Sequence, residues 1–417
     1  MKHNSWNSVL LRDVATFASG KTPSRSRQAD YFDAGTVPWV KTMDLTNAGV
    51  LRTDERVTER AISETRLAVL PVGTVLVAMY GGFKQIGRTG ILRVPAATNQ
   101  AITAILPNPE RLNSDYLLYF LNYNIGYWRT VASSSRKDPN ITKADVKALL
   151  LALPSLHEQT VIARVLNGAD ELIATLERMI AKKRAIKQGM MQQLLTGKTR
   201  LPSFTAPWRE VLLGEHVSYV KTVALSRAQL DGESPVRYLH YGDIHTRSRV
   251  TLDAAHEAMP RASSTLLRNA GRLQVGDLVF ADASEDPDGV GKSVEVTSVP
   301  DAGVVPGLHT IAARFDEAVL ADGFKAYLQF IPSFRDALLR LAAGTKVLAT
   351  TRSFISSITL TLPDIDEQRA IASVIAAADR EIAILRVRLA KAREIKQGMM
   401  QELLTGRTRL PFTEGTA

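Results

Sequence analysis

The sequence predicts a mixed α/β protein: two globular α/β modules joined by two long antiparallel helices, paired like a coiled coil about an internal pseudo-twofold axis. The main observation is a duplication, because residues 158–202 recur at residues 367–411 with a constant offset of 209 and 28 of 45 positions identical. Two copies at so long a period do not make a solenoid, so the chain contains the same half twice. The expected order is module 1 (residues 1–153), a first long helix (154–202), module 2 (203–362), and a second long helix with a tail (363–417).

The composition is that of a soluble globular protein. The length of 417 residues favours two to four domains, and 45% hydrophobic with 23% charged residues is ordinary. The lack of cysteine excludes disulfides and thiolate metal sites. The first residues lack the apolar stretch of a secretory signal, and apolar runs such as residues 148–153 are far too short to span a bilayer. We expect a cytoplasmic protein with no membrane association.

The net charge of +10 is concentrated in the duplicated block. The first copy holds eight Lys and Arg against four Asp and Glu, and the second holds nine against five, so each copy carries +4. Basic surfaces attract nucleic acid by neutralising phosphates and releasing counterions. Long solvated helices also carry many Lys and Arg without binding a partner, so the charge favours nucleic acid without deciding for it.

Each copy of the block begins and ends as a long helix does. The starts are capping-box patterns, with an N-cap residue three positions before a glutamate. The ends are a glycine followed by a proline. The capping pairs are Ser155 with Glu158 and Asp364 with Glu367, and the stops are Gly197 with Pro202 and Gly406 with Pro411. Each helix is therefore about 40 residues, or roughly 60 Å, long.

Between these ends, apolar residues alternate at spacings of four and three, which is a heptad seam. A lone helix would expose this seam, so the two helices are expected to pack on each other. The first copy has Ile162, Leu166, Ala169, Ile173, Leu176 and Ile180, then a shift to Ile186, Met190 and Leu194. The second copy has Ile371, Ile375, Ala378, Ile382, Leu385 and Leu389, then Ile395, Met399 and Leu403.

Gly189 and Gly398 occupy matching mid-helix positions, where glycine costs about 1 kcal/mol relative to alanine. Its presence in both copies indicates a close helix crossing or a docking point for another subunit. The residues expected in the helix pair and in partner docking are Ile173, Leu176, Ile180, Gly189, Met190, Ile382, Leu385, Leu389, Gly398 and Met399.

The two modules resemble each other more faintly. Each opens with a tryptophan before an apolar segment, at Trp6 and Trp208, and each closes on a strand-like stretch that ends in Leu-Pro. Each has a Val-Gly pair before an apolar run, and one helical stretch. The runs are residues 72–78 and 275–281, and the helical stretches are residues 114–122 and 323–342. Similar helices with divergent modules suggest one scaffold that presents two specificities.

No catalytic or metal-binding constellation is recognisable. Two Gly-Lys-Thr sequences end like a P-loop, but Ala15 and Gln192 replace its first glycine. No Gly-rich dinucleotide motif, amino-methylation motif or His-Glu-x-x-His motif is present. Residues 284–295 match part of an EF-hand loop, but Pro287 interrupts it and a strand-like sequence follows, so a turn between strands is far better supported than calcium.

The two Glu-Gln-starting helices each carry an Ile-Lys-Gln-Gly-Met-Met-Gln-x-Leu-Leu-Thr-Gly block, and each follows a module. With these features the chain resembles, over essentially its whole length, the specificity subunit of type I restriction–modification systems. The family-like motifs of module 1 are Ser19-Gly20-Lys21-Thr22-Pro23-Ser24, Val37-Pro38-Trp39-Val40-Lys41-Thr42, Gly87 and Asn99-Gln100. Those of module 2 are Tyr241-Gly242-Asp243-Ile244 and Pro306-Gly307-Leu308-His309. Module 2 lacks Ser-Gly-Lys-Thr and Asn-Gln, so its contact residues cannot be read from module 1.

The resemblance implies a non-catalytic DNA reader in which each module is a target recognition domain for one half of a bipartite, asymmetric site. It implies that the helix pair fixes the distance between the halves and docks two modification subunits, which methylate adenine with S-adenosylmethionine. Restriction subunits with translocase activity are a further partner, and they would use ATP and Mg²⁺. The chain itself is expected to hold no cofactor.

Base reading needs donors and acceptors on loops that enter a groove. The candidate DNA contacts in module 1 are Lys41, Thr42, Tyr80, Lys84, Ser135, Arg136, Lys137 and Asn140. Those in module 2 are Tyr241, Asp243, His245, Lys292, His309, Thr345, Lys346 and Arg352. Each could instead be a solvated surface residue or a phosphate contact.

Three other classes of protein fit parts of the pattern. The main alternative is a two-headed coiled-coil DNA-binding regulator without a methyltransferase partner. A single-chain restriction–methylation enzyme is disfavoured by the missing motifs, and a structural coiled-coil adaptor would show no salt-sensitive DNA binding.

Overall fold

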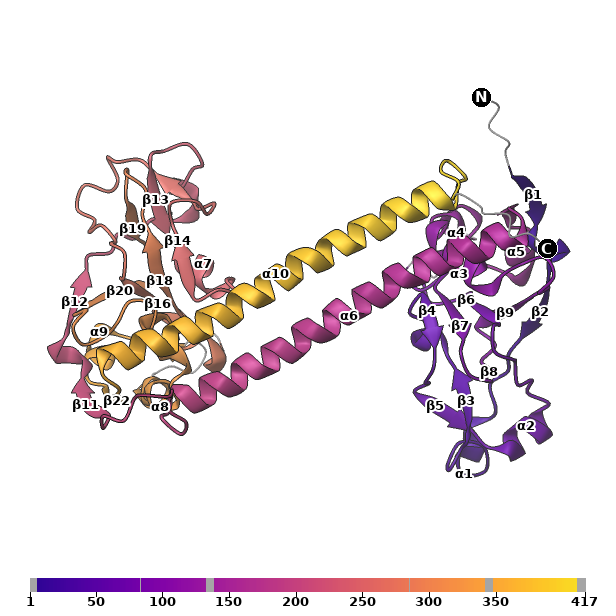
Figure 1. Cartoon of the computed structure of the whole chain (residues 1–417), viewed down its shortest axis with the longest axis horizontal. Coiled ribbons are helices and arrows are strands. Elements are labelled where there is room, and N and C mark those ends of the chain that lie inside the picture. Colours follow the sequence, from indigo (N-terminus) through magenta and orange to yellow (C-terminus); the bar gives the residue numbers. More distant parts are fainter. Residues whose placement is uncertain (1–5, 83, 133–138, 285, 342–347, 411–417) are drawn as a thin grey trace. The chain divides into compact units, whose positions relative to one another are not determined.

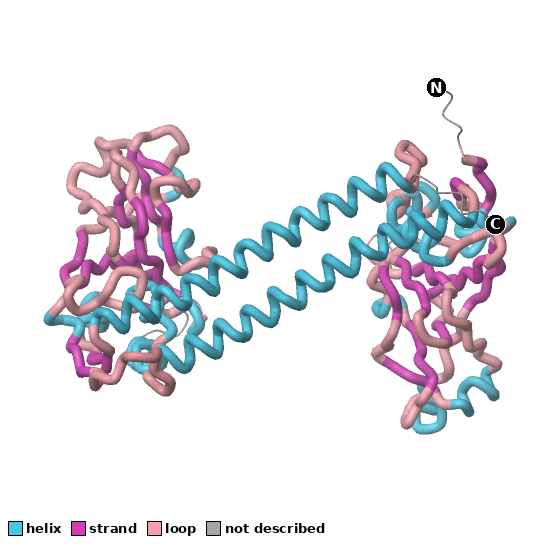
Figure 2. Tube along the Cα trace, viewed as in Figure 1, coloured by secondary structure: helices cyan, strands magenta, loops and turns pink. Residues whose placement is uncertain are grey.

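A computed structural model describes residues 6–82, 84–132, 139–284, 286–341 and 348–410, and Figures 1 and 2 show its helices and strands. The chain forms two compact units: unit 1 comprises residues 1–178 and 387–417, and unit 2 comprises residues 179–386. Unit 1 holds module 1, the first part of helix α6 (Leu156–Leu194) and the last part of helix α10 (Ile365–Leu403). Unit 2 holds module 2, the last part of α6 and the first part of α10. Both long helices are confirmed; the four-part division of the chain stays a prediction.

The described part of module 1 has ten strands and five shorter α-helices. The strands are β1 (Asn7–Leu10), β2 (Ala15–Ser19), β3 (Val37–Val40), β4 (Ala48–Val50), β5 (Glu55–Val57), β6 (Val75–Ala78), β7 (Thr89–Leu92), β8 (Ala97–Thr98), β9 (Ile102–Pro107) and β10 (Leu150–Leu153). The helices are α1 (Gln28–Tyr31), α2 (Glu59–Thr65), α3 (Ser114–Tyr123), α4 (Tyr127–Val131) and α5 (Lys143–Lys147). The expected helix at residues 114–122 is confirmed as α3.

These strands form a five-stranded sheet of order β2-β9-β6-β7-β4, a three-stranded sheet of order β5-β3-β8, and the pair β1-β10. Strand β6 is buried throughout, because alternate side chains enter different cores. Val75 and Val77 pack with α3 and the long helices, whereas Leu76 and Ala78 face the core on the other side of the sheet.

Module 2 repeats this plan. Its strands are β11 (Arg209–Leu212), β12 (Val217–Val220), β13 (Val236–Leu239), β14 (Thr251–Asp253), β15 (Arg261–Ala262), β16 (Leu278–Ala281), β17 (Ala283–Ser284), β18 (Ser293–Ser298), β19 (Val304–Pro306), β20 (Thr310–Phe315), β21 (Leu348–Ala349) and β22 (Thr359–Leu362). Its helices are α7 (Tyr241–His245), α8 (Pro332–Leu341) and α9 (Arg352–Ser356).

The sheets of module 2 match those of module 1 strand for strand, in the orders β12-β20-β16-β18-β14, β15-β13-β19 and β11-β22. Even the two-faced burial recurs, with Leu278 and Phe280 of β16 in one core and Val279 and Ala281 in another. Module 2 adds the short pair β17-β21, which has no counterpart among the described strands of module 1. The faint similarity between the modules in sequence is therefore a shared topology.

The helix predicted for residues 323–342 is wrong as a single element. A 3₁₀ helix covers Lys325–Phe330, and α8 begins only at Pro332. Proline excludes the helical conformation for the residue before it, and Ile331 is extended, with φ −74° and ψ 118°.

Both long helices start at the predicted caps. Ser155 Oγ accepts the backbone N–H of Glu158 (3.2 Å), and Asp364 Oδ1 accepts that of Glu367 (2.9 Å). Among the described residues, the Glu367 side chain accepts no hydrogen bond from the backbone N–H of Asp364. Its carboxylate instead accepts hydrogen bonds from Arg200, so this side chain joins the helix start to the residues after α6.

Each module core takes in the start of one long helix and the end of the other. In unit 1, Ile162 and Leu166 of α6 share a core with Leu403 and Leu404 at the end of α10. In unit 2, Ile371 and Ile375 of α10 share a core with Leu194 and Leu195 at the end of α6. Apolar side chains at the two ends of each helix thus fix it to both modules.

The middle of the predicted seam is wrong. Ile186 and Ile395 are exposed (44% and 50%), although the pattern places them inside. In unit 2, Lys187 of α6 reaches Asp379 of α10 (2.6 Å). In unit 1 the matching pair is Lys396 with Asp170 (2.6 Å). Ion pairs therefore replace apolar contacts at this level.

Further pairs show that the two helices run antiparallel inside each unit. In unit 1, Arg393 binds Glu177, so the contact moves forward along α6 from Asp170 to Glu177 while it moves back along α10 from Lys396 to Arg393. In unit 2, Lys183 binds Glu381 in the same sense. The expected close crossing at Gly189 and Gly398 is also wrong, because a Cβ added at either would meet nothing within 4 Å.

Candidate nucleic-acid interface

The described candidate DNA contacts of module 1 gather at one edge of its five-stranded sheet. Strand β6 ends there and β9 begins there, with Ala78 opposite Ile102. The loop after β3 lies beside them, because the Asn99 N–H donates to the carbonyl of Val40 (3.0 Å). We call this the loop edge of module 1, comprising residues 20–22, 41–44, 79–82, 84–88 and 99–101.

The loop after β6 is glycine-rich and presents Tyr80 and Lys84. Tyr80 is 45% exposed, and Lys84 is exposed as well. Gly81 and Gly82 adopt positive φ values of 110° and 72°, which favour glycine. Gly87 (φ 75°) closes the loop so near Trp128 that an added Cβ would lie 2.0 Å from its ring. This loop is the most open of the module 1 candidates.

Asn140 reaches the same edge, because the next residue, Ile141, donates its N–H to the carbonyl of Met79 (3.0 Å). Ser135, Arg136 and Lys137 lie outside the described residues, and their DNA contacts stay predictions.

Lys41 is already occupied. Its ammonium group donates to Asp54 (2.9 Å) and Glu55 (2.7 Å), and the hydrogen bond that it donates to Glu55 is the largest cause that raises the pKa of Lys41. This pairing argues against a phosphate contact by Lys41. Thr42, the next residue, opens the short turn after β3.

The family-like motifs of module 1 brace this edge. An added Cβ at Gly20 would lie 1.9 Å from the carbonyl oxygen of Thr98, so only glycine allows the chain to pass β8 so closely. Lys21 N–H then donates to the same carbonyl (3.0 Å). The hydroxyl of Thr22 donates to Gln100, which links two motifs 78 positions apart in the sequence.

Module 2 has an equivalent edge, where β13 and β16 end and β20 begins. We call residues 240–245, 282–284, 286–292 and 307–309 the loop edge of module 2. His240 directly follows β13 as Lys41 follows β3, and His309 directly precedes β20 as Ala101 precedes β9. In both modules an aspartate holds the turn: Asp44 accepts the N–H of Lys41 (2.7 Å), and Asp243 accepts that of His240 (3.3 Å).

At this edge Tyr241 lies among three histidine rings. Its ring centroid lies 4.6 Å from that of His240, 5.3 Å from His309 and 6.0 Å from His245. The structure thus brings His309, which precedes β20, beside the candidates Tyr241 and His245, which both lie on α7. Lys292 joins them, because its ammonium group donates to the carbonyl of His245.

The remaining module 2 candidates differ in surroundings. Asp243 is bound by Arg227 (3.2 Å) and by the turn backbone, which argues for a structural role. Arg352 lies apart from the histidines, with its guanidinium 5.5 Å from the ring of Tyr219. Thr345 and Lys346 lie outside the described residues.

Sequence reasoning missed His240 and Asp282, which complete the ring cluster. Asp282 Oδ1 lies 3.2 Å from His309 Nδ1. Alignment of the two turns after β3 and β13 would have found His240, because it shares its position with the candidate Lys41. No local signal marks Asp282, which the sheet brings to His309 from 27 residues away.

A tyrosine, an aspartate and a lysine connect module and helices in each unit. In unit 1, the Tyr119 hydroxyl donates to Asp170 of α6 (2.7 Å), which also accepts from Lys396 of α10 (2.6 Å). In unit 2, Tyr327 lies beside Asp379 of α10, which accepts from Lys187 of α6 (2.6 Å). Burial is the largest cause that raises the pKa of both tyrosines.

Most of the expected docking residues serve the chain itself. Leu176 and Ile180 on α6, and Ile382 and Leu385 on α10, are buried. Ile173 and Leu389 are half-buried, and Met190 and Met399 pack against the module cores. Other apolar side chains of the long helices, which are not among the expected docking residues, are exposed instead: Leu172, Val387 and Ile395 in unit 1, and Met179, Ile186 and Ile384 in unit 2.

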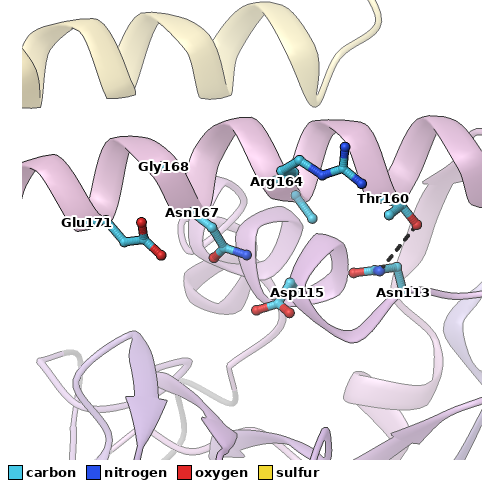
Figure 3. Close-up of a pocket in the computed structure, with 8 residues that line it drawn as sticks. Asn113, Asp115, Thr160, Arg164, Asn167, Gly168 and Glu171 are labelled. Atoms are coloured by element: carbon cyan, nitrogen blue, oxygen red, sulfur yellow. Dashed lines mark hydrogen bonds between the residues drawn. The ribbon is translucent and has the colours of Figure 1, made fainter. Parts of the chain in front are cut away.

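A shallow hollow of about 440 Å³ lies beside α6 in unit 1 (Figure 3). Asn113 and Asp115 line it from the start of α3, and Arg164, Asn167 and Glu171 line it from α6. Asp115 is paired with Arg93, so the hollow offers no unpaired carboxylate couple of the kind that acid–base catalysis uses.

The described residues show no metal site. They hold no group of three or more histidine and carboxylate side chains placed to bind a metal ion. The partial EF-hand match fails for a separate reason, because Glu295 lies in β18 and accepts the backbone N–H groups of Gly323 and Ala326. No described helix combines the length and apolar character needed to cross a bilayer.

Comparison with known proteins gives these features a context. Residues 3–187 match the family model described as the type I restriction modification DNA specificity domain. The specificity subunit of the type I restriction enzyme MjaIX from Methanocaldococcus jannaschii is 30% identical over 172 residues, 40% of this chain and 38% of that protein. The MjaVIII specificity subunit of the same organism is 23% identical over 97% of this chain and 93% of its own length.

A solved structure shares the fold. The crystal structure of the type I restriction-modification S subunit from M. genitalium superposes with a TM-score of 0.59 at 14% identity, covering 99% of this chain and 98% of that one. At this identity the likeness concerns the fold alone.

Proposed function

We propose that this chain is a type I restriction–modification specificity subunit, that it recognises a bipartite, asymmetric DNA site, and that it docks two adenine methyltransferase subunits. DNA recognition is the family's role; the bipartite site and the docking are further parts of the proposal. The observation that carries it is the pair of modules with the same sheet topology and different side chains at equivalent loop positions. Two copies of one scaffold that present different chemistry suit two different half-sites.

The equivalent positions illustrate the difference. After the central strand of the smaller sheet, module 1 has Lys41 and Thr42 where module 2 has His240 and Tyr241. Directly before the equivalent strands β9 and β20, module 1 has Ala101 where module 2 has His309. A site read by such unlike surfaces has unlike halves.

The basic charge supports DNA binding less directly than the sequence suggested. Lys183 and Lys187 in unit 2, and Arg393 and Lys396 in unit 1, are ion-paired between the long helices. Part of the basic charge in each copy of the duplicated block therefore stabilises the helix pair. The net charge of +10 still favours a polyanionic partner.

Docking of modification subunits is supported by apolar surface that the chain leaves uncovered. Each unit exposes apolar side chains on its long helices, and Gly189 and Gly398 have open space where a side chain would project. Exposed apolar groups at matching repeat positions, such as Ile186 and Ile395, fit one partner type bound twice. S-adenosylmethionine, ATP and Mg²⁺ would be bound by partner subunits, and the chain would itself be non-catalytic and act in the cytoplasm.

The test is a base-resolution map of methyladenine in the native host, with and without this gene. A bipartite motif that disappears on deletion supports the proposal and reveals both half-sites. An unchanged map, in a host whose modification subunit is active, would contradict it.

The alternative of a DNA-binding regulator without a methyltransferase partner makes the same DNA prediction. Co-purification of the chain with the modification subunit at a ratio of one to two would decide against the regulator.

A further inference from the structure

Three of the chain's seven histidines surround Tyr241 at the loop edge of module 2, whereas module 1 has no histidine beyond His3. The cluster draws on the turn after β13, on α7 and on the residue before β20. The loop edge of module 2 therefore differs in its chemistry from the loop edge of module 1.

The hydrogen bonds fix which ring nitrogen of each histidine carries a proton. His240 Nδ1 accepts the Gly242 N–H (3.1 Å), so its proton is on Nε2, and burial lowers the pKa of this ring. His245 Nε2 lies 2.9 Å from the Ala283 carbonyl, which only accepts, so Nε2 is the donor. His309 Nδ1 lies 3.2 Å from the Asp282 carboxylate and donates to it.

His309 is the most exposed of the three histidines. Its side chain is 51% exposed, and no hydrogen bond to its Nε2 is seen within the described residues. Its backbone has φ 56°, a region that is strained for a non-glycine residue and often found at functional sites. Ala101, its counterpart, does not adopt such a φ.

We infer that His309 is a specificity-determining residue of module 2, whose ring makes a hydrogen bond through Nε2 to a base edge in one half-site. Tyr241 and Asp282 are its positioning residues, because the tyrosine ring packs against it and the carboxylate holds Nδ1. The inference rests on the proposed function. Because Asp282 takes Nδ1, Nε2 is the ring nitrogen that is left for a base.

The experiment uses the chain co-expressed with its modification subunit in a host without other adenine methylation. Methyladenine maps are compared for the wild type, His309→Gly and Arg52→Ala, the last as a control in module 1 outside its loop edge. His309→Gly relieves the backbone strain, so its unfolding midpoint should not fall, which separates folding from reading. We expect His309→Gly to relax one base pair in one half-site and leave the other half unchanged.

A second measurement follows the binding of each complex to the mapped duplex and to a duplex changed at that one base pair. The wild type should bind the mapped duplex roughly tenfold more tightly than the changed one, and His309→Gly should lose this difference. An unchanged motif, or a discrimination that survives in His309→Gly, would overturn the inference while leaving the proposed function intact. Absence of any bipartite motif with the wild type would overturn both.

Discussion

Arg200 and Glu367 form a two-point ion pair, with Nε and Nη2 each 2.6 Å from a carboxylate oxygen, and so tie the segment after α6 to the first turn of α10 within unit 2. Trp208 Nε1 donates to the same carboxylate (3.2 Å). The corresponding pair in unit 1, Arg409 with Glu158, is longer, at 3.8 Å.

The first prediction concerns this pair. Glu367 is fully buried, so Glu367→Ala leaves its partners without an acceptor and should lower the free energy of unfolding of unit 2 by about 3 kcal/mol. Chemical unfolding of the full chain measures the change. The matched variant Glu158→Ala should cost less, and equal losses would contradict the difference between the two pairs.

The second prediction concerns the glycine-rich loop of module 1. Gly87→Ala should destabilise module 1 by more than about 2 kcal/mol, because the new Cβ meets Trp128 at 2.0 Å and φ is 75°. Gly82→Ala has a similar φ of 72° and nothing within 4 Å, so about 1 kcal/mol is expected. Equal unfolding midpoints for the two variants would refute the contact with Trp128.

The third prediction is that the free energy of unfolding of unit 2 depends on pH. Burial raises the pKa of Glu295 to about 7, although two backbone N–H groups favour its charged form. A carboxyl group with a raised folded pKa favours folding below its unfolded value near 4.5, and this contribution disappears as the pH rises through 7. The free energy of unfolding should fall by roughly 3 kcal/mol between pH 4.5 and pH 8 from this group.

Urea unfolding of the wild type and of Glu295→Gln across that range provides the check. The variant has no titrating group here, so the difference between the proteins should change with pH. A constant difference would show that Glu295 stays charged in the folded state.

The fourth prediction tests docking at the helix glycines. Gly189→Ala and Gly398→Ala should each stabilise the free chain by about 1 kcal/mol, since the new methyl groups meet nothing within 4 Å. If a modification subunit packs there, the same changes should weaken its binding about tenfold. Gly168→Ala is the control, because this helix glycine also has open space and its counterpart is already Ala377. Binding as tight as that of the control would exclude docking at these glycines.

The fifth prediction tests the loop edge of module 1. Lys84→Ala should weaken DNA binding at about 150 mM salt and reduce the slope of log affinity against log salt by about 0.9. Arg52→Ala, an exposed residue between β4 and β5, should leave both unchanged. Arg136→Ala is expected to act like Lys84→Ala. Unchanged affinity would remove either residue from the interface.

The sequence predicted the elements whose cause is local or repeated. The caps at Ser155 and Asp364 and the duplication itself located both long helices. The sequence failed where a distant partner decides. Lys41 looked available for DNA because nothing nearby in the sequence shows that β5 brings Glu55 to it.

The same reason explains the seam. Ile186 was expected inside because its spacing fits, but the register with α10 places Asp379 where Lys187 can reach it. Whether residue 186 or residue 187 faces α10 depends on the side chains of α10, so it cannot be read from the sequence of α6 alone. The histidine cluster likewise required the adjacency of β13 and β19, which local patterns do not encode.

The division of the cores has a consequence for biosynthesis. Unit 2 is one continuous stretch of chain, so all of its core residues have been translated once residue 386 has been added. Unit 1 needs Leu403 and Leu404, which the ribosome adds only after the whole of unit 2. Module 1, although translated first, must wait with an incomplete apolar core until α10 is finished. The half that is translated second can thus complete its folding first.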